Sequence, residues 1–257
     1  MNVDPRFAGI DRLYGAGSAA RLARTHVCVV GLGGVGSWAA EALARSGVGE
    51  LTLIDADEVC VSNTNRQSHA LEGEVGRPKV EVVAQRLRAI NPALCVHTLA
   101  DFVTTKNLET LMTRGYSAVI DACDALRIKV EMIAFCRRRK IPIVVSGSAG
   151  GRADPTLITA RDLSKTEHDI LLALVRKKLR DDYGWTRNPK RYFGVQAVFS
   201  RENVTYKQPD DSTCDTRGVD ADRGLKLDCA GGLGAAMHVT ATFGMVAAAR
   251  AIEKLLA

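Results

Sequence analysis

The chain has 257 residues, of which 46% are hydrophobic and 25% are charged, and its formal net charge is +6. A chain of this length buries enough apolar surface to fold without a disulfide or metal staple, and the composition is that of an ordinary globular protein. The seven cysteines are odd in number and irregularly spaced, which indicates free thiols in a reducing compartment. No two of them form a C-x-x-C pair, so the sequence argues against a cysteine-rich structural zinc site.

Two segments bear on localisation. Residues 1–12 carry four charged side chains and lack the apolar core of a signal peptide. The stretch 229–249 is long enough to span a membrane, but it contains early glycines, threonines and His238, and alanine supplies much of its apolar character. We interpret this stretch as a packed helix or a helix at a subunit interface, and we expect a cytoplasmic protein.

The first part of the chain alternates apolar, β-branched segments with amphipathic ones. Residues 26–30 are apolar and end at a glycine, as a buried parallel strand does. The predicted strands are 26–30, 51–54, 95–99, 118–120 and 141–145, and the predicted helices are 37–45, 79–90 and 126–139. Strands separated by helix-length segments predict an α/β fold with a Rossmann-like, doubly wound, mostly parallel sheet.

The pattern changes after residue 150. Strands are predicted at 156–159 and 195–199, a helix with a basic face at 170–180, a polar loop at 208–224, and a closing helix. We therefore expect one unit over 1–160 and a mixed C-terminal extension over 161–257 that packs on the same sheet.

Positive charge is concentrated in one segment, because residues 137–191 contain fourteen Lys or Arg against six Asp or Glu. Such a segment is either a solvated helix surface or a surface that binds a polyanion through its phosphates.

A glycine motif follows the first predicted strand and opens the first predicted helix. It has the form G-x-G-x-x-G, with its glycines at Gly31, Gly33, Gly34 and Gly36. Such a turn lets the backbone approach a phosphate at a helix N-terminus, which predicts a nucleotide site; a tight turn needed only for packing is the other interpretation. Asp55 ends the second strand 24 residues after Gly31, where an acidic residue meets a ribose in this fold. Asp57 is a further candidate, or a solvated loop acid.

Donor side chains beyond the second strand distinguish a triphosphate from a dinucleotide. These donors are Asn63, Asn65, Arg66, Gln67 and Lys79. Amide and cationic donors of this number suit a triphosphate. Asp121 and Asp124 follow the fourth strand, and Asp124 is placed to hold Mg²⁺ against the phosphates. A polyphosphate cradle with a metal carboxylate favours adenylyl transfer over hydride transfer, so residues 1–160 are predicted to be an ATP-binding adenylation domain, with Arg66, Lys79 and Asp124 catalytic.

Together these motifs resemble the adenylation domain of ubiquitin-activating-like enzymes, which the molybdopterin and thiamin adenylyltransferases share. The resemblance covers roughly residues 6–150. It implies a homodimer in which an arginine from the N-terminal segment of one copy reaches the ATP of the other. Arg6 matches that arginine by its position, and Arg12 is the second choice.

One branch of this superfamily, the tRNA threonylcarbamoyladenosine dehydratases, is similar along the whole chain. The matching stretches are 6–7, 12–15, 36–41, 65–67, 69–71, 136–142, 149–151, 154–155 and 228–230. The sulfur-carrier branch usually has two zinc-binding C-x-x-C pairs, which this sequence lacks. The resemblance implies a ligase-type reaction in which ATP and Mg²⁺ activate a carboxylate on a modified tRNA adenosine. The carbamoyl group of the same side chain then closes a ring, with net loss of water, and proximity supplies much of the rate. The segment 137–191 is then the expected contact for tRNA phosphates.

Cys229 lies between Asp228 and a glycine-rich turn, and related enzymes use a cysteine for acyl or sulfur transfer. A lone cysteine at a helix start is more often structural, so a catalytic role for Cys229, with a sulfur-transfer partner protein, is the secondary interpretation. Two alternatives remain for the whole chain: adenylation of a ubiquitin-like sulfur-carrier protein, and an NAD-binding oxidoreductase or nucleotide sensor.

Overall fold

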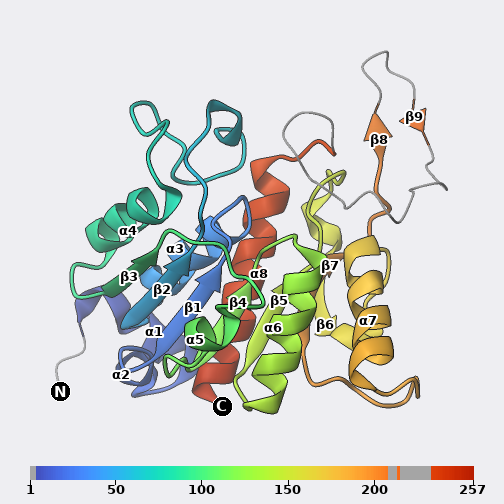
Figure 1. The fold of residues 1–257 in the computed structure, drawn as a ribbon. Helices are drawn as coiled ribbons and strands as arrows, with labels where there is room; N and C mark the ends of the chain where they lie inside the picture. Colours follow the sequence, from blue (N-terminus) through green and yellow to red (C-terminus); the bar gives the residue numbers. More distant parts are fainter. Residues whose placement is uncertain (1–3, 208–212, 215–232) are drawn as a thin grey trace.

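The protein is built on one seven-stranded sheet with the strand order β3-β2-β1-β4-β5-β7-β6 (Figure 1). The computed structural model describes residues 4–207, 213–214 and 233–257. The strands are β1 (His26–Val30), β2 (Glu50–Ile54), β3 (Cys95–Leu99), β4 (Ala118–Asp121), β5 (Ile143–Ser146), β6 (Ile158–Asp162) and β7 (Gln196–Ser200). Neighbouring strands are parallel except for β6, which pairs antiparallel with β7 at one edge. The predicted α/β, Rossmann-like, mostly parallel sheet with a mixed C-terminal part is confirmed.

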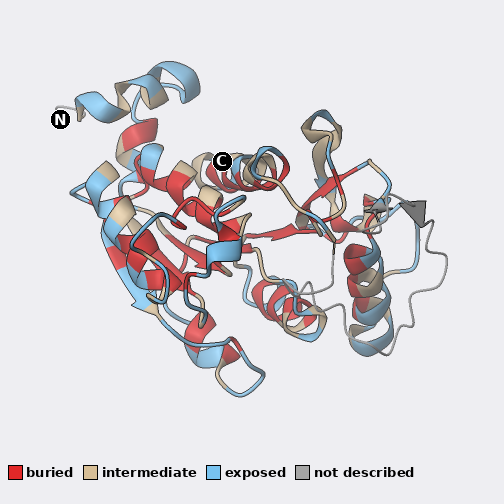
Figure 2. Ribbon diagram, turned by 90° about the horizontal axis from the view of Figure 1, so that it is seen from above, coloured by how far each residue is buried: buried red, intermediate tan, exposed pale blue. Residues whose placement is uncertain are grey.

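Helices cover both faces of the sheet. They are α1 (Ala8–Tyr14), α2 (Ser18–Leu22), α3 (Gly36–Arg45), α4 (Lys79–Ile90), α5 (Leu108–Met112), α6 (Leu126–Arg138), α7 (Ile170–Tyr183) and α8 (Met237–Leu256). One apolar layer joins the sheet to α3, α4 and α8, and a second joins its other face to α5, α6 and α7. Figure 2 shows the buried strands between these layers. Strands buried on both faces are continuous apolar runs, which explains the absence of alternation in β1, β2, β4 and β5.

Differences from the predicted elements arise next to prolines and in short helices. The predicted strand 141–145 begins only at Ile143, since Pro142 lacks the N–H that a strand residue donates. The predicted strand 156–159 begins at Ile158, because Asp154 accepts a hydrogen bond from the backbone N–H of Thr156 and caps a turn at Pro155–Leu157. Helices α1, α2 and α5, of five to seven residues, were not predicted. The two-stranded ribbon β8 (Tyr206–Lys207) and β9 (Thr213–Cys214) was not predicted either.

The C-terminal part of the chain continues the same sheet. Strand β6 runs across residue 160, and β7 inserts between β5 and β6. The division into 1–160 and 161–257 therefore crosses a strand and stays a prediction. Among the described residues, no helix combines the length and apolar character that crossing a bilayer requires.

Helix α8 packs very closely on α3. A Cβ built at Gly244 would lie 2.5 Å from the carbonyl oxygen of Val35, and one built at Gly34 would lie 3.1 Å from the Cβ of Thr240. These contacts bring the last helix of the chain against the glycine motif, so α8 is part of the support of that turn.

A buried ion pair joins the end of β4 to α6. The Nζ of Lys129 lies 2.9 Å from Oδ1 of Asp121, and both side chains are fully buried. Burial alone would lower the pKa of Lys129, but the Asp121 carboxylate, together with Cys123 and Asp124, raises it. A buried charge that loses its partner is strongly destabilising, whatever the net contribution of the intact pair.

The substitution Lys129→Met tests this dependence. It leaves the Asp121 carboxylate buried without its cation, so we expect the free energy of unfolding to fall by about 3–5 kcal/mol in urea denaturation. The half-exposed Lys178 provides the matched control, and Lys178→Met is expected to change stability by less than about 0.5 kcal/mol. Similar small effects of the two substitutions would contradict the assignment.

Candidate active site

The predicted site residues gather at the carboxyl edge of the parallel sheet. The glycine turn follows β1, Asp55 follows β2, and Asp124 lies three residues beyond the end of β4. Because β2 and β4 flank β1 on opposite sides, the chain leaves β1 at a topological switch point, where ligands bind in open α/β sheets. Figure 1 shows the loops of this edge above the sheet.

The glycines of the motif have different reasons for lacking a side chain. Gly31 has φ +84°, and a Cβ there would lie 3.0 Å from the backbone of Ala122. A Cβ at Gly36 would lie 1.7 Å from the carbonyl oxygen of Gly31. Gly31 and Gly36 are therefore required by the turn itself. No described atom lies within 4 Å of a Cβ built at Gly33, so packing does not explain that glycine and its position is open to an approaching group.

Asp55 connects the glycine turn to the loop that follows β2. Its Oδ2 accepts a hydrogen bond from the backbone N–H of Leu32 at 2.6 Å, and its Oδ1 accepts one from Asp57 at 2.9 Å. Burial raises the pKa of Asp55, and the Lys79 charge opposes that rise. Each carboxylate oxygen keeps further acceptor capacity, which suits a ribose hydroxyl pair.

Lys79 is held beside Asp55 and Asp57. Its Nζ lies 2.8 Å from Oδ2 of Asp57, and its side chain is 7% exposed against 56% for Asp57. His69 is fully buried nearby, and burial, with smaller contributions from the Lys79 and Arg86 charges, lowers its pKa to about 4. Burial therefore favours the neutral form of the His69 imidazole.

The backbone of the 63–67 loop is anchored to α3 and to the start of α8. The carbonyl oxygen of Arg66 accepts a hydrogen bond from Nε1 of Trp38 at 3.0 Å and one from Oγ1 of Thr240 at 3.4 Å. The carbonyl oxygen of Asn65 accepts a hydrogen bond from the backbone N–H of Met237 at 3.0 Å. This loop is thus fixed against the same two helices that carry the glycine turn.

The side chains of this loop are placed unequally. Asn63 is buried, and its Oδ1 accepts a hydrogen bond from the backbone N–H of Cys60 at 3.1 Å, so it shapes the loop. Gln67 is buried, and its Oε1 has no hydrogen-bond partner among the described residues. Arg66 is partly buried, and its Nη1 donates to the carbonyl oxygen of Ser62 at 2.6 Å. Asn65 donates from Nδ2 to the carbonyl oxygen of Ala235 at 2.7 Å.

The two aspartates after β4 differ in exposure. Asp121 is fully buried and paired with Lys129, and its Oδ1 also accepts a hydrogen bond from the backbone N–H of Cys123. This placement favours a supporting role for Asp121 beneath the site. Asp124 is exposed on the same loop, where its carboxylate is open to a hard cation.

A second buried pair lies beyond the carboxyl end of β5. The Nη2 of Arg152 lies 3.6 Å from Oδ2 of Asp169, and both side chains are fully buried. Asp169 caps α7 by accepting from the backbone N–H of Leu172 at 2.8 Å, and it accepts from that of Ser148 at 2.9 Å. This pair fixes the start of α7 to the edge that carries the site.

Three predicted residues are not assembled with the others. Arg6 is exposed and pairs with Asp4, its Nη2 lying 2.5 Å from Oδ2. Arg12 is exposed on α1, which Figure 1 shows at the lower side of the sheet, away from the glycine turn. A contribution from either arginine would therefore come from a second copy of the chain. Cys229 lies outside the described residues.

Sequence reasoning missed the residues that support the site, above all Lys129, Trp38 and Thr240. A signal existed for Lys129, because it is a charged residue on the helix face that Met132, Ile133 and Cys136 otherwise make apolar. Such a residue indicates a buried partner. Nothing local to Trp38 or Thr240 indicates that both reach the backbone of Arg66.

Two glycine substitutions separate folding from ligand binding. Gly36→Ala places a methyl group on the backbone of Gly31, so we expect a loss of about 3 kcal/mol or more in unfolding free energy. Gly33→Ala enters open space, so stability should change by less than about 1 kcal/mol, while the Kd for ATP rises about tenfold or more. Urea denaturation and calorimetric titration with ATP measure the two effects. Unchanged ATP affinity in Gly33→Ala would show that the open position is not a ligand contact.

Comparisons with known proteins extend these observations to the whole chain. The model of the ThiF family matches residues 8–257. The chain is 52% identical over 252 residues to the tRNA threonylcarbamoyladenosine dehydratase of Escherichia coli K12, covering 98% of this chain and 94% of that relative. It is 49% identical over 255 residues to the dehydratase of the same name from Haemophilus influenzae, covering 99% and 95%. The crystal structure of E. coli tRNA N6-threonylcarbamoyladenosine dehydratase in complex with ATP superposes with a TM-score of 0.85 at 47% identity, covering 99% of this chain and 97% of that one. The chain belongs to the ThiF family, in the branch formed by these dehydratases.

Proposed function

We propose that this chain is an ATP-dependent enzyme that converts threonylcarbamoyladenosine in tRNA to a cyclic product by adenylating its carboxylate. One observation carries the proposal: the glycine turn, Asp55, Lys79 and the anchored 63–67 loop meet at the switch point of a fold shared nearly end to end with dehydratases of that name. One of those relatives has been crystallised with ATP.

In the proposed first step, a carboxylate oxygen of the modified adenosine attacks the α-phosphorus of ATP. Pyrophosphate leaves, and an acyl-adenylate forms. Gly33 and the N-terminus of α3 let the phosphates approach the backbone closely. Lys79 and Arg66 supply positive charge where negative charge develops, and Asp55 accepts from the ribose hydroxyls.

In the proposed second step, the carbamoyl group of the same side chain attacks the activated carbonyl carbon. AMP leaves with the original carboxylate oxygen, one proton is released, and the net change in the nucleoside is the loss of one water. Both reacting groups are on one side chain, so the protein needs to hold that side chain folded and to exclude bulk water. No enzyme nucleophile takes part, so Cys229 and a sulfur-transfer partner stay outside this reaction.

The exposed Asp124 carboxylate fits Mg²⁺, which prefers oxygen ligands and usually shares them with substrate phosphates. When bound, the ion would neutralise phosphate charge. We also propose a homodimer, because Arg6 and Arg12 lie away from the glycine turn of their own chain and reach a site only across a subunit interface. The reducing cytoplasm, which contains tRNA, is the proposed location.

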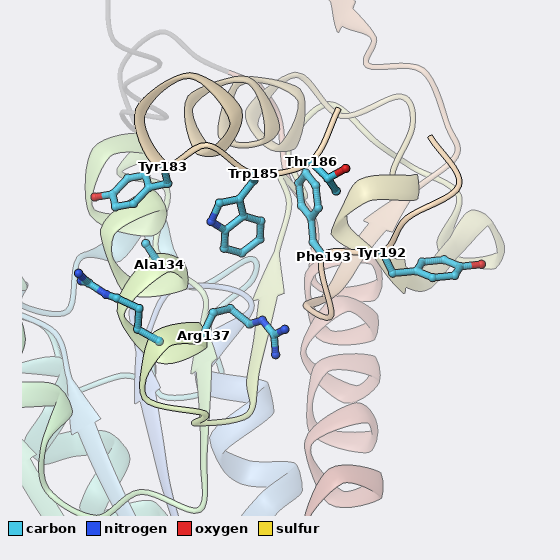
Figure 3. A pocket seen from close by; sticks show the side chains of 8 residues that line it. Ala134, Arg137, Tyr183, Trp185, Thr186, Tyr192 and Phe193 are labelled. Carbon is cyan, nitrogen blue, oxygen red and sulfur yellow. The ribbon is translucent and has the colours of Figure 1, made fainter. Parts of the chain in front are cut away.

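The proposed tRNA-binding surface lies at the C-terminal ends of α6 and α7, away from the glycine turn. A hollow of about 410 Å³ is lined there by Ala134, Arg137, Arg138, Tyr183, Trp185, Thr186, Tyr192 and Phe193 (Figure 3). Trp185 and Phe193 form an edge-to-face pair with ring centroids 4.8 Å apart, and Arg180 lies over the Phe193 ring. Arginines interleaved with aromatic rings bind RNA phosphates and stack on exposed bases.

This hollow is separate from the proposed active site. Helix α6 begins next to Asp124 and has thirteen residues before it ends at Arg138, so its two ends are roughly 20 Å apart. A tRNA is long enough to contact both ends, whereas a small substrate is not. The surface would therefore hold the body of the tRNA while the modified base enters the site.

The central test supplies the protein with ATP, Mg²⁺ and tRNA that carries threonylcarbamoyladenosine, followed by nucleoside mass spectrometry. We expect the modified nucleoside to lose the mass of one water. Lys79→Ala and Asp124→Asn should lower the rate about 10²-fold or more, because each removes a charge that the transition state needs. Lys254→Ala, on an exposed part of α8, is the matched control, and Cys229→Ser should keep most activity. Adenylation of a small ubiquitin-like protein with no reaction on tRNA, or binding of NAD but not ATP, would overturn the proposal.

The tRNA surface is tested by the double substitution Arg137→Glu/Arg138→Glu. We expect the KM for tRNA to rise about tenfold or more, with kcat at saturating tRNA unchanged. The slope of log binding constant against log salt should become shallower by about two, since each lost phosphate contact removes roughly one counterion. Arg24→Glu, at an exposed position near β1, should leave both quantities unchanged. An unaltered salt slope in the double variant would place the tRNA elsewhere.

A further inference from the structure

Three metal-ligating side chains gather at the sheet edge opposite the site, and a fourth, Cys95, lies next to one of them. They come from the beginnings of three adjacent parallel strands: His26 from β1, Glu50 from β2, and Cys95 and His97 from β3. In the strand register, His26 pairs with Glu50, and Glu50 pairs with Cys95. Partners in a parallel ladder project to the same face of the sheet, and so does His97, two residues after Cys95. The register therefore places all four side chains on one face.

Three distances between these ligand atoms are short. Oε1 of Glu50 is 2.7 Å from Nε2 of His97 and 3.5 Å from Nδ1 of His26. Sγ of Cys95 is 3.5 Å from Nε2 of His97. One ligand atom from each of His26, Glu50 and His97 lies within 4.8 Å of the other two.

These distances match the spacing of ligands around zinc. Bond lengths of about 2.0–2.1 Å to nitrogen or oxygen and about 2.3 Å to sulfur put neighbouring ligand atoms of a tetrahedral site roughly 3.3–3.6 Å apart. Two of the three distances already have this value. The third, between Glu50 and His97, is a hydrogen bond that must lengthen by less than 1 Å. Both side chains are free to adjust, being 39% and 46% exposed.

His26 is already oriented for binding. Its Nε2 lies 2.8 Å from Oγ1 of the buried Thr52, and its ring packs edge-on against Tyr116 with centroids 4.8 Å apart. These contacts hold the ring so that Nδ1 faces Glu50. A second hydrogen bond that fixes the ring of a ligating histidine is the usual arrangement in metal sites.

We propose that His26, Glu50 and His97 bind one Zn²⁺ ion, with Cys95 as the fourth ligand. Two imidazoles, a carboxylate and a thiol favour zinc over Mg²⁺ or Ca²⁺, which prefer oxygen ligands alone. The carboxylate and the thiolate together balance the charge of the ion. The positive charge of Arg114 also acts on His26. The site differs in kind from a C-x-x-C zinc site, because its ligands lie on three strands.

The bound ion would tie together the starts of β1, β2 and β3. The strands have five residues each, so the ion would lie roughly 15 Å from the carboxyl edge. Its effect is therefore expected on stability, because a ligand that binds only the folded state stabilises it.

The test uses the full chain, freed of metal with a chelator and then titrated with ZnCl₂. We expect one equivalent to bind with a Kd below micromolar and to raise the Tm by several degrees. His97→Ala and Glu50→Gln should weaken binding at least tenfold and abolish the Tm rise. Co²⁺ in place of Zn²⁺ should give a thiolate-to-metal absorption band that disappears in Cys95→Ser and persists in Cys60→Ser, since Cys60 is an exposed cysteine elsewhere.

His238→Ala is the matched control for histidine loss, because His238 lies at the start of α8 by the other edge of the sheet. It should bind zinc as the unaltered chain does. Equal zinc affinity in His97→Ala, Glu50→Gln and the unaltered chain would overturn the proposal. So would binding without a change in Tm, which would indicate scattered surface binding.

Discussion

The turn between β1 and α3 exists only because no side chain stands at Gly36. The carbonyl oxygen of Gly31 occupies the place that a Cβ would need, 1.7 Å away. This close approach of the Gly31 and Gly36 backbones lets α3 begin directly above β1 and directs the N-terminus of α3 at the switch point. The same principle recurs one layer out, where Gly244 lets α8 approach the backbone of α3. Through Thr240 and Trp38, that packing also fixes the carbonyl group of Arg66, so turn, helices and donor loop form one rigid unit.

Local sequence signals were sufficient where one segment alone determines the structure. The bounds of β1, α4 and β3 agree with the predicted ranges. An apolar run that ends at a glycine marks β1, and Asn91-Pro92 marks the end of α4. The site motifs could also be brought together from sequence, since the carboxyl ends of parallel strands share one edge. Short helices such as α5 have too few residues to show a period. The sequence predicts that Asp121 binds the cofactor. The structure shows that Asp121 is fully buried and paired with Lys129 of α6, a contact that the local sequence does not reveal.

Residues that meet across strands are beyond any local signal. A C-x-x-C pair is visible in the sequence because its two members are neighbours. His26, Glu50 and His97 are separated by 24 and 47 positions, and they meet only because β1, β2 and β3 are adjacent and in register. Cysteine spacing can therefore indicate a C-x-x-C zinc site, but it cannot indicate a zinc site whose ligands lie on three different strands.

The two buried ion pairs explain how the chemistry and the proposed tRNA surface are held in fixed relation. Asp121–Lys129 attaches the first turn of α6 to the edge that carries the site, and Arg152–Asp169 attaches the start of α7 to the same edge. Both helices then run back along the sheet, pack on each other, and end in the aromatic and arginine-lined hollow. Because helices are stiff, a contact made at Arg137 keeps its distance from Asp124. The length of α6 thus fixes the distance between the place where a tRNA would be held and the place where its modified base would react.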